Sequence, residues 1–128
     1  MNVLLVERDR VACEAIFELL QLEWPDMQIY STDNGAAGLD LAKEHDLDLI
    51  LLAYSRRFEG GFDDVDVASA FRHMAESKSV PLIAIIPSSF AGSATAVDLI
   101  AKCNAWLLKP FSAERLYQVV SPFALTTV

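Results

Sequence analysis

The residues best suited to chemistry stand where apolar segments of the chain end. Glu7, Arg8 and Asp9 follow the first such segment, and Lys109 follows the last. A carboxylate can bind a hard cation such as Mg²⁺, and an ammonium group can hold an anion such as a phosphoryl group. The apolar segment in the middle of the chain ends instead on Ala53, whose methyl group offers neither a nucleophile nor a metal ligand.

Five apolar segments alternate with amphipathic ones, and this alternation predicts the fold class. The apolar runs predict strands at Val3–Val6, Met27–Ser31, Asp48–Ala53, Pro81–Ile86 and Ala105–Leu108. The spacing of apolar residues predicts helices from Asp9 to the break at Pro25–Asp26, then at Ala36–Glu44, Val65–Glu76, Ser93–Asn104 and Ser112–Phe123. Strands that alternate with helices form a parallel sheet covered on both faces.

Local signals refine this arrangement of the elements. Asp9 and Ser93 are suited to cap the helices that follow them, and Pro122 marks the end of the last helix. The mixed run Met27–Ser31 predicts an edge strand, and the strongly apolar Asp48–Ala53 predicts a central one. Ligands of such sheets bind beyond the carboxyl ends of the strands, where the polar residues named above stand.

Composition and charge restrict the function classes. With 128 residues, 53% of them hydrophobic, the chain can form one domain with a buried core. The net charge of −8 disfavours binding to nucleic acid, which depends on Lys and Arg against phosphates. Arg56–Arg57 is the only adjacent pair of basic residues in the sequence.

The sequence also indicates the cellular location of the chain and the bounds of its domain. No apolar run approaches the ~20 residues that a membrane span requires, and the first residues show no secretion signal. The isolated Cys13 and Cys103 are typical of reduced thiols. We therefore expect a cytoplasmic domain over residues 1–123 with no membrane or nucleic-acid partner. The tail at 124–128 would be too short for an output domain.

Several short motifs, in this order, resemble the receiver domains of bacterial response regulators. They are Val3–Glu7, Asn34–Gly35 with Gly38–Leu39, Asp48–Leu52 and Lys109–Pro110–Phe111. The resemblance covers nearly the whole chain. It implies a flavodoxin-like (βα)5 doubly wound sheet of five parallel strands in the order 2-1-3-4-5, and a role in the phosphorelays of two-component signal transduction.

In that family an acidic pair and an acceptor Asp hold Mg²⁺, and the acceptor takes a phosphoryl group from a histidine kinase. A Ser or Thr and a Lys then contact this group. By resemblance, Glu7 keeps the first acid and Lys109 the cation, whereas Arg8, Ala53 and Ile86 replace the second acid, the acceptor and the hydroxyl residue. The resemblance thus implies a degenerate phosphorylation pocket.

The charge of Arg8 also opposes a metal ion. Two unit charges ~4 Å apart interact by about 4 kcal/mol at an effective dielectric of ~20. We therefore expect weak or absent Mg²⁺ binding, no other cofactor and no enzymatic activity, with Arg8 and Lys109 free to pair with Glu7. Asp9, Glu59 or Ser88 could compensate for the losses, but a helix cap is the favoured role of Asp9.

Two surfaces are candidates for protein contacts. Trp106 stands at the position of the family's switch aromatic, on the face through which receivers dimerise or dock; a half-buried strand aromatic is the alternative. Phe17 and Cys13 lie beside the apolar stripe of the first helix, and a wider buried stripe is again the alternative. The partner would be a second copy, a histidine kinase or an output domain.

The sequence leads to three further expectations, on a peptide bond, an acidic segment and the function. The family has a cis bond at the position of Lys109–Pro110, and we predict one here. The acidic residues Asp63, Asp64 and Asp66 predict a solvated surface rather than a calcium loop. A phosphorylation-independent domain that acts through protein contacts is the favoured function. Phosphorylation at an unconventional residue and a small-ligand-sensing pocket stay open as alternatives.

Overall fold

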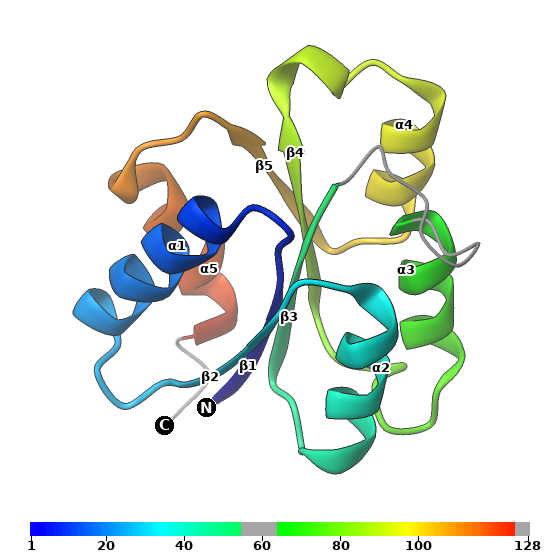
Figure 1. Cartoon of the computed structure of the whole chain (residues 1–128), viewed down its shortest axis with the longest axis horizontal. Coiled ribbons are helices and arrows are strands. Elements are labelled where there is room, and N and C mark those ends of the chain that lie inside the picture. The colour runs from blue at the N-terminus through cyan, green and yellow to red at the C-terminus, as the bar shows by residue number, and fades with distance from the viewer. Residues whose placement is uncertain (55–63, 125–128) are drawn as a thin grey trace.

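The computed structural model describes residues 1–54 and 64–124. Its five strands form one parallel sheet in the order β2-β1-β3-β4-β5 (Figure 1). The strands are β1 (Asn2–Val6), β2 (Gln28–Thr32), β3 (Leu49–Ala53), β4 (Leu82–Pro87) and β5 (Ala105–Lys109). This is the flavodoxin-like topology predicted from the sequence, with β3 in the centre and β2 at an edge.

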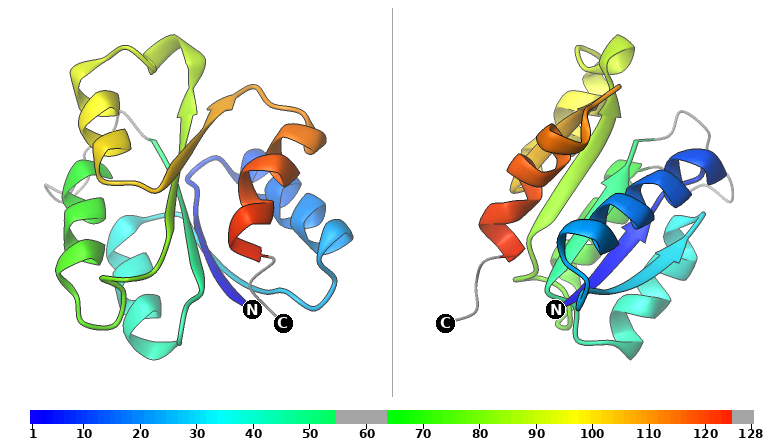
Figure 2. Two further views of the ribbon diagram at one scale, coloured as in Figure 1. Left: turned by 180° about the vertical axis from the view of Figure 1, so that it is seen from behind. Right: turned by 90° about the vertical axis from the view of Figure 1, so that its left-hand side faces the viewer.

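Helices cover both faces of the sheet. They are α1 (Arg10–Glu23), α2 (Gly35–Glu44), α3 (Asp64–His73), α4 (Ala94–Ala101) and α5 (Ala113–Ala124), with a short 3₁₀ helix η1 (Ser88–Phe90) after β4. Figure 2 shows α1 and α5 on one side of the sheet and α2, α3 and α4 on the other. No helix in the described ranges is both long and apolar enough to cross a membrane.

The two layers correspond to two separate apolar clusters, because successive strand residues point to opposite faces. In β3, Leu51 and Ala53 pack with α1 and α5, whereas Ile50 and Leu52 pack with α2, α3 and α4. Every residue of β3 is buried, as expected for a central parallel strand. Gly35 allows α2 to lie close to α3, since a Cβ there would stand 2.3 Å from Val67 Cγ2.

Several boundaries differ from the sequence prediction. Pro122 does not end α5 but lies inside it, and the helix continues to Ala124. The proline removes one N–H from the last turn only, and Phe123 and Ala124 hold that turn by packing against the core. Helix α3 ends at His73 and α4 at Ala101, each three residues before its predicted end.

The early end of α4 leaves Asn104 for another role, at the end of the sheet opposite Glu7. Its Oδ1 accepts hydrogen bonds from the Leu82 N–H at 2.9 Å and from the Arg72 guanidinium at 2.7 Å. Arg72 also donates to the carbonyls of Val80 at 2.6 Å and Lys102 at 3.2 Å. This arginine therefore joins α3 to the segments that enter β4 and β5.

Candidate functional site

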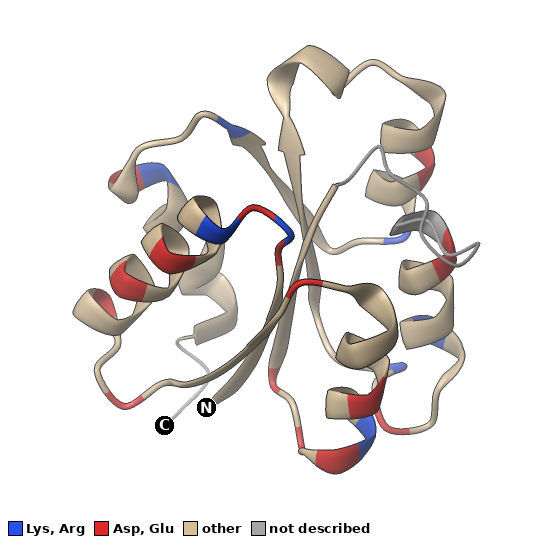
Figure 3. Ribbon diagram, viewed as in Figure 1, with Lys and Arg blue, Asp and Glu red and all other residues tan. Residues whose placement is uncertain are grey.

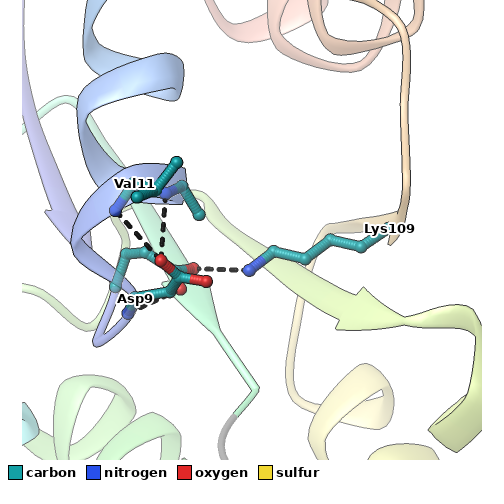
Figure 4. A network of polar contacts seen from close by, with 5 residues as sticks. Asp9, Val11 and Lys109 are labelled. Atoms are coloured by element: carbon teal, nitrogen blue, oxygen red, sulfur yellow. Dashed lines mark hydrogen bonds and ion pairs between the residues drawn. The ribbon is translucent and has the colours of Figure 1, made fainter.

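The carboxyl ends of the strands bring Glu7 and Lys109 together, although 102 positions separate them. Glu7 directly follows β1, and Lys109 is the last residue of β5. The Lys109 ammonium donates to Glu7 Oε2 over 3.0 Å (Figure 4). The Glu7 side chain is 4% exposed and that of Lys109 is 24% exposed, so solvent screens this ion pair only in part.

Both carboxylate oxygens of Glu7 already accept hydrogen bonds. Oε2 accepts from Lys109, and Oε1 accepts from the backbone N–H of Asp9 at 3.1 Å. A buried carboxylate is stable only when it is paired in this way. The charge of Glu7 is thus balanced within the protein.

Asp9 caps helix α1, as predicted. Its Oδ1 accepts hydrogen bonds from the backbone N–H groups of Val11 at 2.9 Å and Ala12 at 3.3 Å, and Figure 4 shows this cap beside the end of Lys109. These N–H groups have no partner within the helix, so the cap stabilises its first turn.

Ala53 and Ile86 are core residues in the structure. Ala53 is 5% exposed and packs in the cluster beneath α1 and α5, on the face to which alternation also directs Glu7. Ile86 is fully buried in the cluster on the opposite face. Ala53 and Glu7 therefore share one face of the sheet, and Ile86 lies on the other.

Arg8 is half-buried on the other side of Glu7. It lines a hollow of ≈ 290 Å³ between α1 and the end of β2, together with Glu7, Arg10, Cys13, Ser31, Thr32 and Asp33. Within the described ranges, no three His, Cys, Asp or Glu side chains are grouped so that they could hold a metal ion. Glu59 and Asp63 lie outside the described residues.

The segment after β4 is tied to the end of β5. The Ser88 hydroxyl donates a hydrogen bond to the Lys109 carbonyl, and Pro87 pairs with Lys109 in the sheet. The Lys109–Pro110 peptide bond is cis, the geometry expected from the resemblance. The hydroxyl hydrogen of Ser88 is therefore engaged with the backbone carbonyl of Lys109.

Exposed apolar side chains gather at β5 and α4. Trp106 is 51% exposed and Leu108 39% exposed, on the face of β5 that carries no core residue, and Val97 of α4 is 54% exposed. Of these three residues, only Trp106 was predicted from the sequence as a contact residue. Leu108 was detectable as well, because strand alternation places it on the same face as Trp106.

The apolar residues of α1 beside its core stripe differ in how far they are buried. Cys13 and Trp24 pack against the core, which is the wider buried stripe offered as the alternative, whereas Phe17 is 37% exposed. Val11 and Leu22, at 77% and 76% exposed, are further apolar residues that the sequence analysis missed. They share one helix face, as residues 11 positions apart do.

Burial raises the pKa of both cysteine thiols. Desolvation raises the pKa of Cys103 to about 11, although the nearby charges of Arg72 and Lys102 lower it in part. Desolvation likewise raises the pKa of Cys13, while a hydrogen bond with Ser31 opposes this shift. Neither shift favours the thiolate, so both cysteines have the character of packing residues.

Figure 3 shows Lys and Arg dispersed over several elements rather than gathered on one face.

No protein-family model matches the chain. The chain is similar to the cell cycle response regulator CtrA of Brucella abortus (strain S19), with 32% identity over 117 residues that cover 91% of the chain and 47% of CtrA. It is also similar to the polar-differentiation response regulator DivK of Brucella anthropi, with 25% identity over 95% of the chain and 94% of DivK. The chain spans about half the length (47%) of the curated CtrA relatives it matches.

Solved structures agree on the fold. The receiver domain of the sensor histidine kinase PA1611 from Pseudomonas aeruginosa PAO1 superposes with a TM-score of 0.78, over 94% of this chain and 97% of that one, at 20% identity. That crystal structure holds a magnesium ion in its active-site cleft. At this identity the likeness shows the fold alone, which is that of a CheY-like receiver domain.

Proposed function

We propose that this chain is a response-regulator receiver domain of two-component signalling, and that it acts through protein contacts without aspartyl phosphorylation. The similarity to CtrA and DivK and the receiver fold support the signalling role. One observation carries the second half of the proposal. Ala53 ends the central strand, and the nearest retained acid, Glu7, is already paired with Lys109 at 3.0 Å.

Phosphoryl transfer to a receiver needs a nucleophilic oxygen at the end of the central strand. The methyl group of Ala53 has none, so no acyl phosphate can form at this position. Lys109 is the residue that would contact a phosphoryl group in the family, and here its ammonium binds Glu7 instead. The ion pair therefore replaces the interactions that a phosphoryl group and a metal ion would make.

The described residues also do not fit Mg²⁺. This ion requires near-octahedral coordination by oxygen atoms. The acid that follows β1 is Glu7, and both of its oxygens already accept hydrogen bonds, from Lys109 and from the Asp9 N–H. Asp9 uses Oδ1 to cap α1. A metal ion would have to displace Lys109 and would lie next to Arg8.

The output of the proposed domain is a protein surface. Trp106, Leu108 and Val97 expose apolar area on β5 and α4, which a partner protein could cover. A second copy of the chain, a histidine kinase and an output domain are the partners that the resemblance implies. Phe17 on α1 offers a second contact point.

Incubation with acetyl phosphate and Mg²⁺, followed by intact-mass spectrometry, tests the proposal. We expect no phosphoryl adduct on this chain, while a receiver with an intact acceptor Asp, treated in parallel, acquires one. A stoichiometric adduct would overturn the proposal and favour phosphorylation at an unconventional residue. Peptide mapping of that adduct would then identify the residue.

A further inference from the structure

An apolar groove of ≈ 660 Å³ lies between α1, the end of β4 and the turn from β5 to α5. Its volume falls within the ~300–1,000 Å³ typical of small-molecule sites, and it lies beyond the carboxyl ends of parallel strands, where such sheets bind ligands. Figure 1 shows where these three segments lie in the fold. Neither the ion pair nor the surface at Trp106 accounts for this groove.

Small side chains on α1 create the hollow. Ala12 and Ala15 line it, and Ala15 is exposed although its neighbour in the next turn, Leu19, is half-buried. On the opposite wall stands Phe111, which packs against the core below. A larger residue at position 15 would fill the space, whereas alanine leaves it open to a ligand.

Polar residues also line the groove. Among the described residues of its lining, Lys109 alone is charged, and Ser88 and Ser89 carry hydroxyl groups. Lys109 carries three N–H donors, of which one is directed to Glu7. The carboxylates of α1 at Glu14 and Glu18 do not line the groove. Glu7 balances the charge of Lys109, but two N–H donors of the ammonium remain for the oxygen atoms of a ligand, and an anionic oxygen is the strongest acceptor for them.

We propose that this groove binds a small amphiphilic molecule with an apolar body and one anionic oxygen group, such as a carboxylate, directed to Lys109. The apolar body would cover Ala12, Ala15 and Phe111, and the anion would accept the hydrogen bonds that Lys109 and Ser89 can donate. This inference does not depend on the absence of phosphorylation.

The test uses two probes of nearly equal shape, 4-phenylbutyrate and the uncharged 4-phenylbutanol. Each is titrated into the ¹³C-labelled chain while the methyl signals of Ala12, Ala15 and Leu19 are followed by NMR. We expect saturable shifts at these methyl groups, with the carboxylate bound about threefold to fivefold more tightly, as a partly exposed ion pair allows. Equal binding of the two probes would overturn the anionic assignment.

A matched pair of variants locates the site. Ala15→Phe should weaken both probes at least about tenfold by filling the groove, whereas Ala36→Phe, at an exposed alanine of α2, should leave them unchanged. Both positions are exposed, so neither variant should impair folding. Three outcomes would overturn the proposal: no saturable shifts, an unaffected Ala15→Phe variant, or conversion of a wild-type dimer to a monomer by Ala15→Phe in light scattering. The last would show that a second copy covers the groove.

Discussion

Lys109 and Glu7 balance each other's charge at the carboxyl ends of β5 and β1. An ammonium left without its acidic partners at the edge of a core would be costly, because partial burial removes much of its hydration. Glu7 compensates this charge at 3.0 Å and is itself held by the Asp9 N–H. Such a pair adds little net stability compared with apolar residues, but removal of one partner alone is costly.

We expect Glu7→Gln to lower the free energy of unfolding by about 1–3 kcal/mol, because it leaves Lys109 without a counter-charge. The double variant Glu7→Gln, Lys109→Met should lose less than the sum of the two single changes, since the cation is then gone. Denaturant unfolding of the four proteins measures this coupling. Additive losses would show that the pair does not interact in solution.

Ala53→Asp alone should not create a phosphorylation site. The new carboxylate would lie near Lys109 and Glu7, and Arg8 would still occupy the position of the second acid. The double variant Ala53→Asp, Arg8→Asp supplies three carboxylates and should accept a phosphoryl group from acetyl phosphate in the presence of Mg²⁺. Intact mass distinguishes the two variants. An adduct on the single variant would mean that Arg8 is no obstacle.

Cys103 should react slowly with alkylating reagents in the folded protein. Burial raises its thiol pKa to about 11, so at pH 8 only about one molecule in a thousand carries the thiolate. The alkylation rate should rise about tenfold per pH unit to about pH 11. Because the folded-state pKa is raised, the thiol contributes stability below pH 9 that is lost between about pH 9 and 11. Equal rates in folded and urea-unfolded protein at pH 8 would contradict this expectation.

At the scale of elements, two ends of the sheet are held by different means. The carboxyl ends of β1 and β5 are joined by the ion pair, and the entry to β4 and β5 is joined to α3 by Arg72. Carbonyl groups in loops need partners when they are partly buried, and a guanidinium supplies several donors in one plane. A single side chain thus replaces the regular hydrogen bonds that the loops lack.

Arg72→Met should lower the free energy of unfolding by about 2–4 kcal/mol, since it removes the guanidinium donor of the Val80 and Lys102 carbonyls and one of the two hydrogen bonds to Asn104. Arg10→Met is the matched control. The Arg10 side chain is 91% exposed, and its single ion pair with Glu14 at 3.6 Å should contribute less than about 0.5 kcal/mol. Chemical denaturation compares the two. Similar losses of unfolding free energy in the two variants would show that Arg72 does not join α3 to the segments that enter β4 and β5.

For the whole molecule, the two clusters account for stability and the exposed edge at β5 remains available for function. A parallel sheet with helices on both faces buries its central strands completely, but the edge strand β5 is covered on one face only. Exposed apolar residues at such an edge contribute little to folding. Contact with another protein is the role that we propose for them.

Neighbouring residues of β5 allow a direct test of this division. Leu107→Ala removes a side chain that is 1% exposed and should cost about 2–5 kcal/mol. Trp106→Ala, at the adjacent but half-exposed position, should cost less than about 1.5 kcal/mol in the isolated chain. Thermal and chemical unfolding measure both. A loss at Trp106 that equals the loss at Leu107 would assign the tryptophan to the core.

Much of the fold was predictable because it depends on local patterns. The alternation of apolar runs and amphipathic segments located all five strands within one or two residues, and Asp9 and Ser93 cap their helices as predicted. The predicted end of α5 at Phe123 lies one residue from the observed end at Ala124, but the role of Pro122 was wrong, since local rules treat a proline as a stop. Packing of Phe123 and Ala124 on the core overrides that signal.

The sequence by itself determined which chemical groups are present: Ala53 has no nucleophile, Arg8 has no carboxylate, and no folding can supply either. It also determined the order of the strands through the family pattern. Only the tertiary structure decided that Lys109 binds Glu7, that Ile86 lies on the opposite face of the sheet, and that Cys13 packs against the core while Phe17 is 37% exposed. Such pairings depend on strand register and helix orientation, which join residues that are distant in the sequence, and no local pattern encodes them.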